Sequence, residues 1–110
     1  MSPDAWRLLD GRAERARRSW SETLSALPVG ARVRVRVLVT MPFGVFADIE
    51  GQPDALALME ITTLPSGSEL PARGVWLDAV VVDHTAHNWQ VRLRPAETQN
   101  LGWMTIVIRG

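Results

Sequence analysis

The 110-residue sequence contains no cysteine and no lysine. The absence of cysteine excludes disulfides and thiolate chemistry, and it is compatible with a reducing compartment. No apolar run approaches the length needed to cross a bilayer, and the N-terminus lacks the charged-then-apolar layout of a secretory signal. We therefore expect a cytoplasmic protein that has no membrane partner.

All 12 basic residues are arginines, and 12 acidic residues bring the formal net charge to zero. A neutral chain lacks the basic excess of an avid nucleic-acid binder, so any affinity for RNA must come from local clustering and base stacking. Arginine offers a planar fork to phosphate and a flat face to bases. Codon bias is the simpler explanation of the preference for arginine.

Residues that could carry catalysis are sparse. The only histidines are His84 and His87, which fall in a predicted polar turn with no obvious third metal ligand. The acidic residues are scattered, and no glycine-rich phosphate loop is present. We therefore expect neither enzymatic activity nor a bound cofactor or metal.

The N-terminal segment, residues 1–27, is predicted to form an amphipathic helix over residues 3–26. Pro3 suits the first helical turn and Asp4 favours the positive end of the helix dipole. One apolar stripe recurs at spacings of three and four: Trp6, Leu9, Ala13, Ala16, Trp20 and Leu24. The helix arginines lie mostly off this stripe among acidic residues, which favours a solvated face over a phosphate-binding one. We expect Trp6 and Trp20 to pack on the rest of the domain; the alternative is a surface for self-association or for a protein partner, since an apolar stripe must be covered.

The rest of the chain has strand character. Residues 31–41 alternate strictly, with valines expected inward and Arg32, Arg34 and Arg36 outward. Further strands are expected within residues 42–49, 55–61, 75–82 and 89–94, separated by a turn at 51–54, a long connection at 62–74 and a polar turn at 83–88. In the third strand, Leu56 and Leu58 are expected inward. A final apolar run at 103–109, within a C-terminal extension of residues 96–110, either adds a strand, packs on the helix or forms a dimer through an open edge.

The segment 42–49 organises this pattern. Gly44 within a strand suggests a bulge or a barrel corner. One extra residue there would bring the rings of Phe43 and Phe46 to the same surface. Phe46 shares its alternation with Asp48, which should face outward, so we expect Phe46 to be exposed. The pattern leaves open whether Phe43 is buried or exposed.

Five strands with a long break between the third and fourth match a five-stranded Greek-key barrel of the OB type with an added N-terminal helix and C-terminal strand. A family resemblance is carried by Gly30, Val37, Phe43-Gly44-Val45-Phe46-Ala47-Asp48-Ile49, Gly51, Leu56, Glu60-Ile61-Thr62, Gly74, Val82-Asp83 and Val91-Arg92-Leu93. Over residues 28–95 they resemble the S1-type RNA-binding domain. The most specific part is Phe-Gly-x-Phe followed by an acidic residue.

The resemblance implies a surface for single-stranded RNA. The family's two phenylalanines correspond to Phe43 and Phe46, its Asp to Asp83, and its basic residue to the neighbourhood of His87, with Arg92 close by. The family's histidine position falls on Ala57, so that contact is missing.

We therefore expect a non-catalytic module that binds single-stranded RNA. In this hypothesis the two phenylalanines stack on bases, and Asp83 and His87 add polar contacts. Phosphates are attracted by Arg34, Arg36, Arg92 and Arg94. The alternative is a protein-interaction or regulatory module on an OB scaffold whose RNA surface has degenerated. Zero net charge, Ala57 and five tryptophans favour that alternative.

Overall fold

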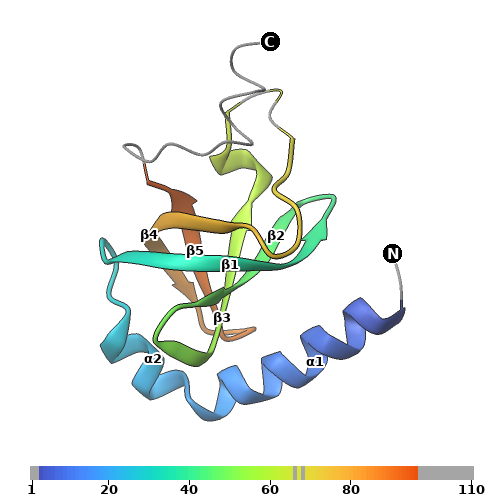
Figure 1. Cartoon of the computed structure of the whole chain (residues 1–110). Helices are drawn as coiled ribbons and strands as arrows, with labels where there is room; N and C mark the ends of the chain where they lie inside the picture. The colour runs from blue at the N-terminus through green and yellow to red at the C-terminus, as the bar shows by residue number, and fades with distance from the viewer. Residues whose placement is uncertain (1–2, 66, 68, 97–110) are drawn as a thin grey trace.

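Two helices lie along one side of a five-stranded barrel in the computed structural model, which describes residues 3–65, 67 and 69–96 (Figure 1). The elements are α1 (Pro3–Arg18), α2 (Trp20–Ala26), β1 (Arg32–Met41), β2 (Gly44–Ile49), β3 (Gln52–Glu60), the 3-10 helix η1 (Ile61–Thr63), β4 (Trp76–Thr85) and β5 (Gln90–Pro95). The barrel closes in the order β1-β2-β3-β5-β4, with β3 and β5 parallel and the other neighbours antiparallel. The predicted mainly-β, OB-type barrel with an N-terminal helix is thus confirmed. The strand expected at 103–109 lies outside the described residues.

The helix predicted over residues 3–26 is interrupted at Ser19, where the backbone φ is −101° and ψ is 12°. The interruption shifts the buried stripe. Before it, Leu9 and Ala16 are buried, whereas after it Thr23 is buried and Leu24 is exposed. Trp20 packs against the barrel core, as expected for this stripe. No helix in the described part of the chain is long and apolar enough to span a membrane.

The apolar residues form two layers. The barrel interior contains the inward side chains of all five strands, including Val35, Val45, Ala57, Met59, Val81 and Leu93. A second layer joins Leu9 and Ala16 of α1 to the outer surface of the barrel at Met41, Phe46, Leu56 and Leu58. Phe46, Leu56 and Leu58 therefore form a covered face on β2 and β3. The prediction that Leu56 and Leu58 point inward is wrong. Both faces of β3 are apolar, so alternation alone could not show which face lines the interior.

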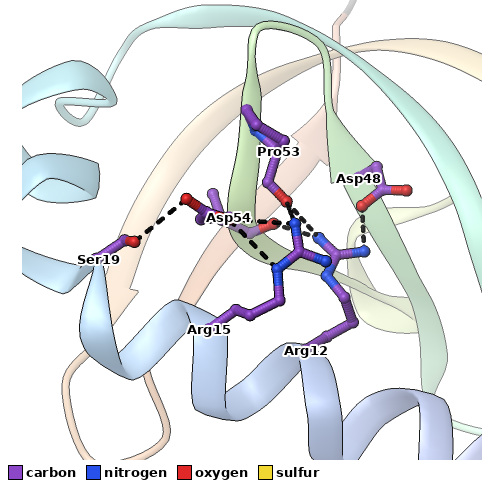
Figure 2. A network of polar contacts seen from close by, with 7 residues as sticks. Arg12, Arg15, Ser19, Asp48, Pro53 and Asp54 are labelled. Carbon is purple, nitrogen blue, oxygen red and sulfur yellow. Dashed lines mark hydrogen bonds and ion pairs between the residues drawn. The ribbon is translucent and has the colours of Figure 1, made fainter.

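A buried guanidinium fixes α1 to the end of the β2–β3 hairpin (Figure 2). Arg12 is only 7% exposed, and its Nη2 donates to the backbone oxygens of Ala55 at 2.8 Å and Pro53 at 3.2 Å. Its Nη1 forms an ion pair with Asp48 on β2. Arg15, one turn further on, donates to Asp54 and to the same Pro53 oxygen. Arg12 thus links α1 to both β2 and β3. These oxygen acceptors offset the cost of burying its charge.

Turn positions account for the remaining differences from the predicted strands. The β2–β3 turn falls at Glu50 and Gly51, so Pro53 and Asp54 belong to β3 rather than to a turn. Likewise, Asp83 and His84 extend β4, and the following turn spans residues 86–89. The bulge expected near Gly44 is absent from the strand pairings of the described residues. Their register shifts fall between Val37 and Val39, between Ala47 and Ile49, and between Val81 and Asp83.

Gly44 is required for a different reason. Its φ is +151°, and a Cβ there would lie 2.3 Å from the backbone oxygen of Met59. We predict that Gly44→Ala lowers the free energy of unfolding by about 2–4 kcal/mol, since a strained φ and a steric clash each cost on the order of 1–3 kcal/mol. Urea denaturation measures the change. Gly51→Ala is the matched control, because φ there is +81° but the space is open. Its cost should be about 1–2 kcal/mol. Equal costs would contradict the close approach of β3.

The Arg12 contact makes a second prediction. Arg12→Met keeps the packed stem but removes the guanidinium, and we expect it to destabilise the protein by about 2–3 kcal/mol in urea denaturation. Arg15→Met is the matched control, since Arg15 and Asp54 are about half exposed. An exposed pair contributes at most about 1 kcal/mol, so this variant should lose little. Similar losses in both variants would show that burial of Arg12 does not matter.

Candidate nucleic-acid interface

Phe43 and Phe46 lie next to each other but have different environments. Phe43 occupies the two-residue turn between β1 and β2 and is 45% exposed, whereas Phe46 on β2 is 6% exposed. Their ring centroids are 6.0 Å apart at an interplanar angle of 87°, a favourable edge-to-face arrangement. The two rings therefore lie on the same side of the barrel wall and in contact, as predicted.

The prediction that Phe46 is exposed is wrong. Alternation correctly places Phe46 on the outside of the barrel, but Leu9 and Ala16 of α1 cover that face. Phe46 therefore supports the ring of Phe43 and is not itself open to a ligand. The open question about Phe43 is resolved in favour of exposure.

A shallow groove of about 320 Å³ lies beside the two rings. This Phe43 groove is lined by Phe43, Phe46, Leu58, Glu60, Asn88, Gln90 and Arg92. Its apolar residues come from β2, β3 and the turn before β2, and its polar residues come from the ends of β3 and β5 and the turn before β5. Arg92 forms an ion pair with Glu60 across the parallel β3–β5 contact. The groove thus combines an exposed aromatic ring, two amides and a guanidinium.

Two predicted polar residues lie near this groove. Asp83 is opposite Arg92 in the β4–β5 ladder, and its Oδ1 accepts a hydrogen bond from the backbone N–H of His84 at 2.8 Å. His87 is exposed in the turn that also supplies Asn88. Asn88 and Gln90 were not predicted. They carry no distinctive pattern in the sequence, and only the register of β5 against β3 brings them beside the rings.

The remaining predicted arginines lie elsewhere. Arg34 and Arg36 are exposed on β1, where they face Asp78 and Trp76 on β4. Phe43 lies just beyond the end of β1, and Arg36 is five residues before that end, or about 17 Å at the usual strand rise. Arg94 on β5 donates to the backbone oxygen of Pro95. The structure therefore places Arg92, but not the β1 arginines, beside the phenylalanines.

The helix arginines mostly bind acidic groups of the chain itself. Arg17 and Arg18 both pair with Glu14, and the hydrogen bond from Arg17 is the main reason why the pKa of Glu14 is lowered. Arg12 and Arg15 pair with acidic residues of the β2–β3 hairpin. Arg15, Arg17 and Arg18 are exposed, which agrees with the expected solvated, mixed-charge face, whereas Arg12 is buried against the hairpin.

Comparison with known proteins identifies the fold. No protein-family model matches the sequence, and no curated protein matches it. Among solved structures, RNase R of Mycoplasma genitalium in complex with ribose-methylated single-stranded RNA is similar over 71% of this chain and 14% of its own, with 14% identity and a TM-score of 0.59. GSP13 of Bacillus subtilis is similar over 74% of this chain and 71% of its own, with 14% identity and a TM-score of 0.53.

A multidomain protein with nucleic-acid-binding domains from Streptococcus pneumoniae is similar over 66% of this chain, with 15% identity and a TM-score of 0.56. The similarity spans only 24% of that protein's chain. At these identities the likeness is one of fold. It agrees with the five-stranded barrel of the OB type and with the suspected S1-type domain.

The different burial of the two rings gives a stability prediction. Phe46→Ala should lower the free energy of unfolding by about 3–5 kcal/mol, as for other buried phenylalanines. Phe43→Ala should cost about 1 kcal/mol or less, because only the edge-to-face contact is lost. Urea denaturation of the two variants tests the difference. Equal costs would mean that α1 does not cover Phe46 in solution.

Proposed function

We propose that the protein is a non-catalytic module of the cytoplasm that binds single-stranded RNA in the Phe43 groove. The observation that carries the proposal is an exposed phenylalanine, braced by a second ring, beside a groove with amide and guanidinium groups. A base can stack on the open face of Phe43, because every base has a π-face. The amides of Asn88 and Gln90 can then hydrogen-bond to base or ribose.

Arg92 supplies the positive charge of the groove. Its guanidinium is paired with Glu60 in the free protein, so a phosphate must compete with that carboxylate. A single stacked base contributes on the order of 1–3 kcal/mol. One exposed ring and one shared arginine therefore support weak binding with little sequence preference. RNase R, part of which is similar to this chain in fold, was solved in complex with single-stranded RNA, and this supports the ligand class.

The alternative is a protein-interaction module on the same scaffold. Ala57, which takes the position of the family's histidine, is fully buried in the barrel interior. The Ala57 side chain therefore cannot contact a ligand on the outside, and α1 covers the adjacent face. These two observations favour a degenerate RNA surface, and they make a direct binding test decisive.

The binding test uses Phe43→Ala and a labelled single-stranded RNA of mixed sequence, about 12 nucleotides long, within the range of OB-fold site sizes. We expect the variant to bind about fivefold to a hundredfold more weakly by fluorescence anisotropy, in proportion to the lost stacking. Affinity should also fall as salt rises, because phosphate contacts release counterions.

Ile61→Ala is the matched control. Ile61 is 42% exposed, and its backbone N–H bonds to the oxygen of Phe43, so it is an apolar neighbour that does not line the groove. It should bind RNA as the unaltered protein does. An unchanged affinity for Phe43→Ala would refute the groove as the binding site. A loss of similar size in both variants would indicate a general apolar surface and favour the protein-interaction alternative.

A further inference from the structure

The outer surface of β1 and β4 carries a second combination of aromatic and basic groups. Trp76, the first residue of β4, is 43% exposed. Trp20 and Trp89, in contrast, pack partly buried against the two apolar layers. An indole presents a large apolar area that folding normally covers. The exposure of Trp76 therefore calls for an explanation that the barrel does not supply.

The guanidinium of Arg34 lies over the Trp76 ring, with Cζ 5.2 Å from the ring centroid. This cation–π contact holds the indole in place from one side. The remaining exposed area can receive a stacking partner without a change of the ring's position. The geometry is thus that of an ordered platform rather than of a loose side chain.

Arginines extend the platform along β1. The Val-Arg alternation puts Arg32, Arg34 and Arg36 on the exposed outer face of β1, and Arg36 is opposite Trp76 in the β1–β4 ladder. Arg73 is also exposed, and it precedes Gly74, whose N–H bonds to the backbone oxygen of Val37. Trp76, Arg32, Arg34 and Arg36 are called the Trp76 patch below.

Acidic groups near the patch are fewer than the arginines. Asp78 faces Arg34 in the ladder, and Glu50 follows β2 beside the backbone of Arg34. Asp48, opposite Arg36, is already bound by Arg12. Even when Asp78 and Glu50 are both counted, the patch and Arg73 keep a positive excess. A polyanion with planar rings satisfies these groups, whereas an apolar protein surface would strip water from several guanidinium groups.

We propose that the Trp76 patch is a second contact for single-stranded RNA, at which a base stacks on Trp76 and phosphates bind the β1 arginines. Its ligand class rests on the proposed function, but its residues are separate from the groove. Asp83 marks the position of the groove on β4, because it lies opposite Arg92. Trp76 is seven residues away on the same strand, or about 23 Å at the usual strand rise. At 3.4 Å per stacked nucleotide, about seven nucleotides span the two contacts.

The test compares Trp76→Ala with Val82→Ala, an exposed apolar residue on the same strand. The probe is a labelled mixed-sequence RNA of about 16 nucleotides, at the upper end of OB-fold site sizes. Trp76→Ala should weaken binding about fivefold to a hundredfold, and Val82→Ala should not. Trp76→Phe should keep most of the affinity, because it retains a stacking ring. Urea denaturation verifies that all variants remain folded.

A charge-matched pair tests the arginines. Arg34→Gln should reduce the slope of log affinity against log salt by about 0.7, the value for one phosphate contact on a single strand. Arg18→Gln removes the same charge from α1, where Arg18 pairs with Glu14, and should leave the slope unchanged. Equal effects would show that only net charge matters and would overturn the proposal.

The two binding proposals fail in different ways. If Phe43→Ala weakens RNA binding and Trp76→Ala does not, the groove binds RNA and the Trp76 patch does not. If only Trp76→Ala weakens binding, the patch is the RNA site and the groove proposal fails. If Trp76→Ala leaves RNA binding unchanged but lowers the molar mass measured by light scattering, the patch is an interface between copies of the chain, and the proposal is wrong.

Discussion

The contact between α1 and the β2–β3 hairpin decides what the outside of this barrel can bind. Arg12 lies at its centre, with one guanidinium shared among Asp48 and the backbone oxygens of Pro53 and Ala55. A cation so deeply buried is tolerated because three oxygen atoms lie against its two terminal nitrogens. Around it, Leu9 and Ala16 exclude water from Phe46, Leu56 and Leu58. The helix is therefore part of the domain's packing rather than an appendage.

This packing separates the roles of the two phenylalanines. With α1 in place, Phe46 is buried and packs against the ring of Phe43, which is exposed. The surface therefore offers one ring where the S1-type pattern implies two. The loss of one stacking ring makes additional contacts more important. The β1–β4 surface is a candidate for them, because it carries the exposed β1 arginines beside the exposed ring of Trp76.

The sequence allowed the barrel to be predicted because its signals are local. Alternation in β1, the Phe-Gly-x-Phe segment and the long 62–74 connection each depend on neighbouring residues. Exposure is not local. Alternation grouped Phe46 with Asp48 correctly, but it could not show that a helix some 30 residues earlier covers that face. Nor could it orient β3, both of whose faces are apolar. Asn88, Gln90 and Trp76 gain their neighbours only through the pairing of distant strands.

The buried Arg12 also sets the limits of the unit that can be moved between proteins. The resemblance covers residues 28–95, and a fusion designed from it would begin after α2. That fragment would carry Phe46, Leu56 and Leu58 as a bare apolar strip next to an unpaired Asp48. Such strips promote self-association. The portable unit therefore starts at α1, and the similarity boundary cuts through a continuous piece of hydrophobic packing.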